Sequence, residues 1–180
     1  METLVVLDLR SLESGMPALT PALGRVHAEA AAACLDNQGH REPVALSVRR
    51  IDGPGFILRW PELTETMRRA YNDLERATEL GAYGIAIMLI KEQTGLAVVW
   101  QSKKGTGFDY WLGPVEAEDQ LVFQNSARLE VSGILSGTES QFLTRVKQKL
   151  KQTTASDETG LPAYAVVVEF GCPQAEVAKR

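Results

Sequence analysis

The sequence predicts an α/β protein in which a mixed sheet is flanked by helices, and three observations support this fold class. Short apolar segments typical of strands alternate with longer segments whose apolar residues recur at helical spacing. From residue 62 onward the predicted order is helix, three strands, helix and strand, so one strand is reached by a crossover helix. The chain has 180 residues, 44% of them hydrophobic and 23% charged, which is typical of one domain with a packed core.

The first 60 residues predict an N-terminal extension made of a strand, a helix and a hairpin. LVVLDL is a short apolar strand near the start. An alanine-rich segment at 21–35 is followed by Asn and Gly, which indicates a helix with a stop signal. Two short strands, 44–51 and 56–60, surround the turn DGPG. We therefore divide the chain into an extension, residues 1–60, and a core, residues 61–180.

A long helical segment opens the core. Pro61 suits the first turn of a helix, and apolar residues at helical spacing continue until Gly95 ends the segment. Gly81 and Gly84 predict a kink or a division inside it, which gives one long helix or two.

Strand patterns and one further helix follow. The segments 96–102, 107–113 and 127–135 predict three strands, with the acidic loop VEAEDQ after the second. Thr138 with Gln141 forms a capping-box pattern at the start of a helix over 140–152. AYAVVVEF predicts a buried strand, and the residues after it predict a tail.

Charge and apolar content indicate where the protein is located in the cell and which partners it is expected to bind. The net charge of −4 gives no support for non-specific nucleic-acid binding by the whole surface. METLVVLDLR lacks the pattern of a signal peptide, and IAIMLI is too short to span a bilayer, so we expect a cytoplasmic protein that does not enter membranes. Cys34 and Cys172 are far apart and predict two free, buried thiols.

Two carboxylates stand out because they lie among apolar strand residues. Asp109 follows Gly105 and Gly107 at the head of a short strand, and Glu130 alternates with Leu129 and Val131. Burial of a carboxylate is costly unless another group pairs with it. Two such groups on neighbouring strands indicate a site for a hard divalent cation, which prefers carboxylate oxygens, water and phosphate.

The order of elements from residue 62 to 170, with Asp109 on the second strand and Glu130 in LEVSG on the third, resembles the core of the restriction-endonuclease-like, or PD-(D/E)XK, nuclease superfamily. The resemblance implies an αβββαβ core after the N-terminal strand-helix-hairpin extension. It implies that Asp109 and Glu130 are catalytic and bind Mg²⁺ or Mn²⁺. Glu79, in the first core helix, is the expected third metal ligand, with Glu75 and Glu92 as alternatives.

The lysine of the family motif is missing. It would stand at position 132, where this chain has Ser132. In the family that lysine orients or activates the attacking water, and it can move to other elements. The candidate substitutes are Lys103, Lys104, Lys147 and Lys149. Of these four, we name Lys104 and Lys147 as the candidate catalytic lysines.

The function that the resemblance implies is a Mg²⁺-dependent phosphodiester hydrolase acting on DNA, in a DNA-processing or defence system. The acidic net charge favours help from a partner protein subunit in gripping DNA. The residues expected to contact the nucleic-acid backbone are Lys103, Lys104, Arg145, Lys147, Lys149 and Lys151.

Other interpretations stay open from the residues alone. Asp109 is also typical of a plain turn residue, and Glu130 could pair with Arg128 or Arg145 as a structural ion pair. Ser132 favours a decayed nuclease-fold module that serves binding or assembly with a partner protein. The turn KKGTG is also compatible with a small phosphate-ligand binder.

Overall fold

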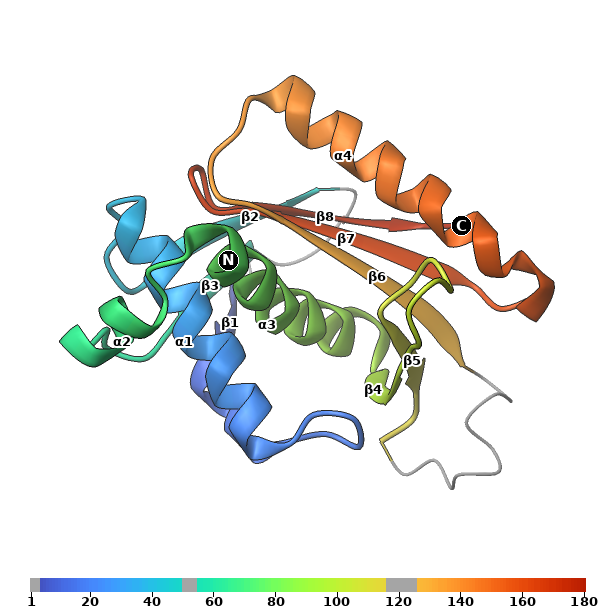
Figure 1. The fold of residues 1–180 in the computed structure, drawn as a ribbon, viewed down its shortest axis with the longest axis horizontal. Coiled ribbons are helices and arrows are strands. Elements are labelled where there is room, and N and C mark those ends of the chain that lie inside the picture. Colours follow the sequence, from blue (N-terminus) through green and yellow to red (C-terminus); the bar gives the residue numbers. More distant parts are fainter. Residues whose placement is uncertain (1–3, 50–54, 116–125) are drawn as a thin grey trace.

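The computed structural model describes residues 4–49, 55–115 and 126–180, and it is an α/β structure built on one mixed sheet (Figure 1). Along the chain the elements are β1 (Leu4–Asp8), the 3-10 helix η1 (Leu9–Ser14), α1 (Pro21–Asn37), β2 (Val44–Arg49), β3 (Gly55–Arg59), α2 (Glu65–Ala70), α3 (Leu74–Thr94), β4 (Ala97–Gln101), β5 (Tyr110–Gly113), β6 (Ala127–Ile134), α4 (Glu139–Gln152), the 3-10 helix η2 (Thr153–Thr159), β7 (Ala163–Glu169) and β8 (Gln174–Lys179). The eight strands lie in the order β1-β3-β2-β8-β7-β6-β5-β4.

The predicted order of elements in the core is confirmed. It runs α3, β4, β5, β6, α4 and β7, in which β4, β5 and β6 are antiparallel neighbours and β6 pairs in parallel with β7. The parallel pair requires the crossover that α4 provides. The predicted strand, helix and hairpin of the first 60 residues are also present, and they join the same sheet because β2 pairs with β8.

Helices α1 and α3 pack together against one face of the sheet (Figure 1). The predicted division of the helix at Gly81 or Gly84 is wrong, since both lie inside α3. A Cβ on Gly81 would lie 2.8 Å from the Ala31 backbone of α1, so glycine permits close contact between the two helices. The actual division lies between α2 and α3, where the side chain of Asp73 caps α3 by accepting hydrogen bonds from two backbone N–H groups.

Helix α4 crosses the opposite face of the sheet, over β6, β7 and β8 (Figure 1). Thr138 and Gln141 form the predicted capping box at its start. Phe142 and Val146 bury the apolar side of α4 against Val167 of β7. Arg145 and Lys149 lie one helical turn apart on the adjoining side of α4. Both therefore contact side chains of β6.

Two further expectations need correction, and two fall largely outside the description. The segment after β7 is not a tail, because it forms β8 in the interior of the sheet. Cys34 is buried as predicted, but Cys172 is exposed. The hairpin turn and most of the acidic loop at 115–120 lie outside the described residues.

Within the ranges that the structure describes, no helix is long and apolar enough to cross a membrane.

Candidate functional site

The start of β5 and the middle of β6 bring Asp109 and Glu130 together. The backbone N–H of Asp109 donates to the carbonyl of Leu129 at 2.8 Å, which places its side chain beside that of Glu130. Both carboxylates line a pocket of about 220 Å³ that we call the acid pocket. Glu130 is only 2% exposed, whereas Asp109 is half-buried. The structure therefore assembles the carboxylate pair that the sequence predicts.

Both carboxylate oxygens of Asp109 accept hydrogen bonds. The Tyr83 hydroxyl of α3 donates to Oδ1 at 3.0 Å, and the backbone N–H of Val131 donates to Oδ2 at 2.8 Å. The pairing of β5 with β6 stops at Leu129, so the N–H of Val131 has no backbone acceptor on β5. The carboxylate of Asp109 takes the place of that acceptor. Asp109 is thus more than a turn residue, since it is fixed between α3 and the edge of β6.

Glu130 receives its partners from the end of α4. Lys149 Nζ lies 2.6 Å from Glu130 Oε1, and the Gln152 side-chain amide donates to the same oxygen at 2.9 Å. Burial, followed by the negative charge of Asp109, raises the pKa of Glu130 from 4.5 to about 7, and Lys149 only partly opposes this. The pair therefore favours either a shared proton or an added cation.

The acid pocket offers two of the carboxylate ligands that a hard divalent cation prefers. Hard cations such as Mg²⁺ are bound through one or two carboxylates together with water and phosphate oxygens, and the acid pocket supplies two carboxylates and open volume. No group of three or more His, Cys, Asp or Glu side chains placed to hold a metal occurs in residues 4–49, 55–115 and 126–180. Glu79 does not join the pair in such a group; it lines a neighbouring pocket.

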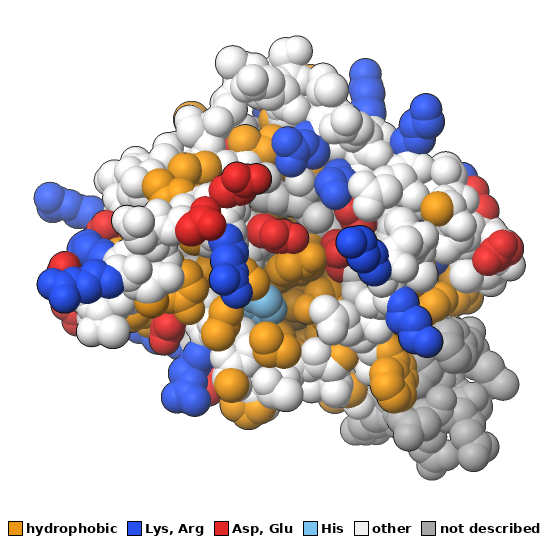
Figure 2. Space-filling model, in the orientation of Figure 1, with side chains coloured by type: hydrophobic (Ala, Val, Ile, Leu, Met, Phe, Trp, Pro, Cys, Tyr) orange, Lys and Arg blue, Asp and Glu red, His pale blue; other side chains and the backbone are white. Residues whose placement is uncertain are grey.

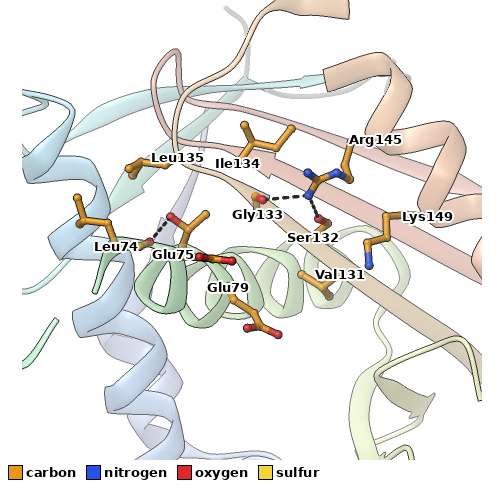
Figure 3. Close-up of a pocket in the computed structure, with 11 residues that line it drawn as sticks. Leu74, Glu75, Glu79, Val131, Ser132, Gly133, Ile134, Leu135, Arg145 and Lys149 are labelled. Carbon is orange, nitrogen blue, oxygen red and sulfur yellow. Dashed lines mark hydrogen bonds between the residues drawn. The ribbon is translucent and has the colours of Figure 1, made fainter. Parts of the chain in front are cut away.

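That neighbouring pocket, called the edge groove below, measures about 540 Å³. It is lined by residues 74, 75, 78 and 79 of α3, by residues 131–134 of β6 and the following Leu135, and by Arg145 and Lys149 of α4. Glu75 and Glu79 project from one wall and Arg145 and Lys149 from the other (Figure 3). On the face drawn in Figure 2, acidic and basic side chains gather side by side between the positions of α3 and α4. Lys149 connects the two pockets, because it lines the groove and bonds Glu130 of the acid pocket.

Ser132 of β6 has a cationic partner from α4. Arg145 Nη1 donates to Ser132 Oγ at 2.8 Å and approaches the carbonyl of Gly133 at 3.5 Å (Figure 3). Glu130 and Ser132 lie on the same face of β6 because side chains alternate along a strand. Arg145 and Lys149 thus place two basic side chains beside this face of β6.

The predicted basic residues fall into three groups, of which Arg145 and Lys149 line the edge groove. Lys103 and Lys104 line the acid pocket with Asp109 and Glu130, from the loop between β4 and β5. Lys147 and Lys151 are exposed and lie outside both pockets.

The alternative ion pairs predicted for Glu130 do not form with the expected partners. Arg128 is buried, and its guanidinium instead donates to the Thr153 and Leu161 carbonyls and to Ser156 Oγ. Arg145 bonds Ser132, as described above. Glu130 takes Lys149 as its cationic partner.

No protein-family model matches the chain, and neither a curated protein nor a solved structure matches it significantly. The functional argument therefore depends on the geometry of the two pockets.

Two residues of the acid pocket escape sequence reasoning. The apolar residues around Tyr83 predict only a core position for this side chain. Its hydroxyl nevertheless donates a hydrogen bond to Asp109 in the acid pocket. Gln152 lies at the very end of α4 and has no motif around it. The signal that could have identified Gln152 is its spacing, because residues 145, 149 and 152 fall on one side of a helix.

Proposed function

We propose that this chain is a metal-dependent phosphodiester hydrolase acting on DNA, with a restriction-endonuclease-like core. The observation that carries the proposal is the meeting of Asp109, Glu130 and Lys149 at one point. Two carboxylates from neighbouring strands share a pocket, and a lysine from the crossover helix lies 2.6 Å from one of them. The order α3, β4, β5, β6, α4, β7 adds support, because the resembling superfamily builds its site on that order.

Each group has a distinct role in the proposed reaction. Asp109 and Glu130 would hold Mg²⁺ or Mn²⁺, and a bound ion would supply positive charge at the scissile phosphate. Tyr83 orients Asp109 through its hydroxyl. Lys149, rather than a lysine at position 132, would stabilise the phosphate and assist the attacking water, with Arg145 close by on the same helix. Lys103 and Lys104 would contact the DNA backbone beside the acid pocket.

The test combines metal titration with cleavage. Calorimetry with Mg²⁺ and Mn²⁺, and gels with labelled DNA, would be run on wild type, Asp109→Asn, Lys149→Met and the control Lys91→Met, which alters an exposed lysine of α3 outside both pockets. We expect Asp109→Asn to lose both metal binding and cleavage. Lys149→Met should still bind metal but cleave about a hundredfold more slowly, because a preorganised charge at the phosphate is lost.

The outcomes separate the alternatives. Cleavage that survives in Asp109→Asn would exclude the proposed site. A wild type that neither binds metal nor cleaves would favour a decayed nuclease-fold module that acts with a partner protein. One observation favours that second candidate: Glu130 is already satisfied by Lys149 and Gln152, so the pair holds together through contacts within the chain.

A further inference from the structure

We propose that the edge groove takes single-stranded DNA in preference to duplex DNA, with the sugar-phosphate backbone along α4 and the bases toward α3. The inference rests on the proposed function and deepens it by naming the substrate class. It depends on three properties of the groove: its narrow floor, the opposite charges of its walls, and its direct connection to the carboxylate pair.

The floor of the groove is the edge of a single strand. Residues 128–134 of β6 pair with β7 on one side, whereas β5 pairs only with residues 127–129 on the other. In the described part of the chain no strand pairs with residues 131–134 on that side. Helix α3 packs closely on the face of β6 beside this edge, since a Cβ on Gly133 would be 2.5 Å from the Thr78 carbonyl. The groove is therefore bounded closely by one strand and two helices.

The two walls carry opposite charges. Arg145 and Lys149 of α4 supply the positive wall, and Glu75 and Glu79 of α3 supply the negative wall (Figure 3). Glu75 and Glu79 are exposed side chains, and no ion pair is recorded for either within the described residues. A single strand matches this asymmetry because its phosphates lie on one side and its unpaired bases on the other.

The negative wall suits bases and opposes a second backbone. Carboxylates accept hydrogen bonds from the exposed amino groups of unpaired cytosine and adenine, and the apolar side chains of Leu74 and Leu135 offer contact for base faces. In a duplex those base edges are already paired, and the second phosphate backbone would approach Glu75 and Glu79. Repulsion between like charges would then weaken binding, most strongly at low salt.

The connection to the carboxylate pair gives the strand a path to the reaction. Lys149 lines the groove and bonds Glu130, while the N–H of Val131, on the groove floor, bonds Asp109. A strand whose phosphates follow Arg145 and then Lys149 arrives at the acid pocket. The phosphate beyond Lys149 is therefore the one exposed to the carboxylates.

The experiment measures the binding preference of the full chain. Fluorescence anisotropy would follow one labelled DNA oligonucleotide, as a single strand and annealed to its complement, in EDTA and again in Ca²⁺ at low salt. We expect the single strand to bind about tenfold more tightly than the duplex in at least one of the two buffers, because only the duplex brings a second row of charges to the negative wall. Equal binding, tighter duplex binding, or no binding of either form would overturn the inference.

A charge reversal on the negative wall provides the matched variant. In Glu79→Lys we expect the duplex to gain more affinity than the single strand, so that the preference falls to about twofold. Glu62→Lys makes the same charge change at an exposed position outside the pockets and should raise both affinities alike. If Glu79→Lys also raises both alike, the assignment of the bases to α3 is wrong. Thermal unfolding checks that both variants remain folded.

Cleavage distinguishes failure of this inference from failure of the proposed function. The same oligonucleotides would be incubated with Mg²⁺ and with Mn²⁺. Preferential binding of the single strand without cleavage would leave the groove assignment standing and remove the hydrolase proposal. Cleavage of duplex together with a preference for binding duplex would support the hydrolase and overturn the single-strand assignment.

Discussion

Replacement of Glu130 by Gln should change how stability depends on pH. The pKa of Glu130 is raised from 4.5 to about 7 by burial and by Asp109, so between these two pH values the folded protein binds a proton that the unfolded chain does not. The stability that this proton contributes is fully present below about pH 4.5, the pKa of the unfolded chain, and is lost as the pH rises through about 7. Gln cannot titrate, and it keeps nearly the same shape. The variant should therefore lack this loss.

The size of the effect follows from the raised pKa. One pKa unit corresponds to about 1.4 kcal/mol, so the interval from 4.5 to about 7 corresponds to about 3 kcal/mol of unfolding free energy. Wild type should lose roughly this much relative to Glu130→Gln between about pH 4.5 and about pH 8. The amount is a large fraction of the stability of an ordinary domain, so it is measurable.

Urea unfolding at a series of pH values is the assay. The control is Glu139→Gln, which replaces an exposed glutamate at the start of α4 whose pKa is lowered by a hydrogen bond from Arg49. There the sign is opposite, because the stabilisation is present above the unfolded pKa and is lost as the pH falls through the folded one. Parallel pH profiles for wild type and Glu130→Gln would show that the pKa of Glu130 is not raised in the folded protein.

Three further changes probe the surroundings of the site by urea unfolding. Gly107→Ala should cost about 2 kcal/mol or more, because φ is +80° and the new Cβ would lie 2.4 Å from a backbone carbonyl at the end of α4. Gly105→Ala, with φ +95° but no atom within 4 Å, should cost only about 1 kcal/mol, and equal costs would contradict the contact. Arg128→Met should cost about 3 kcal/mol, since buried acceptors lose their donor; a loss below about 1 kcal/mol would count against that role. Tyr83→Phe should cost about 1 kcal/mol and weaken Mg²⁺ binding in calorimetry by freeing Asp109, whereas unchanged metal affinity would show that the hydroxyl does not position it.

The sequence predicted most elements of the fold because their patterns are local. Alternation and short apolar runs marked β4, β6 and β7, and the capping box fixed the start of α4. The glycines of α3 misled because a glycine that breaks a helix and one that permits contact with α1 look the same in sequence. Strand β8 was missed since QAEVAK has few large apolar residues, and its place in the sheet depends on pairing with distant β2 and β7.

The carboxylate pair could be predicted, but its partners could not. Asp109 and Glu130 stand out because a charged residue inside an apolar strand is unusual. Which lysine serves them depends on how α4 is rotated about its axis over β6, and that rotation is set by Phe142 and Val146 packing into the sheet. This packing turns Lys149 toward Glu130 and leaves Lys147 exposed, a choice that four neighbouring basic residues do not reveal by spacing alone.

The position of β8 has a consequence for how the protein is made. This strand follows all the other described strands in sequence and lies between β7 and β2, so within the described residues the strands of the first 60 residues reach the rest of the sheet only through it. During synthesis on a ribosome, β2 lacks this neighbour until residues 174–179 have emerged, and its edge stays unpaired while the intervening elements are translated. Such long-range pairing is slow to form and exposes a strand edge to aggregation. We therefore expect the nascent chain to depend on a chaperone until β8 has emerged.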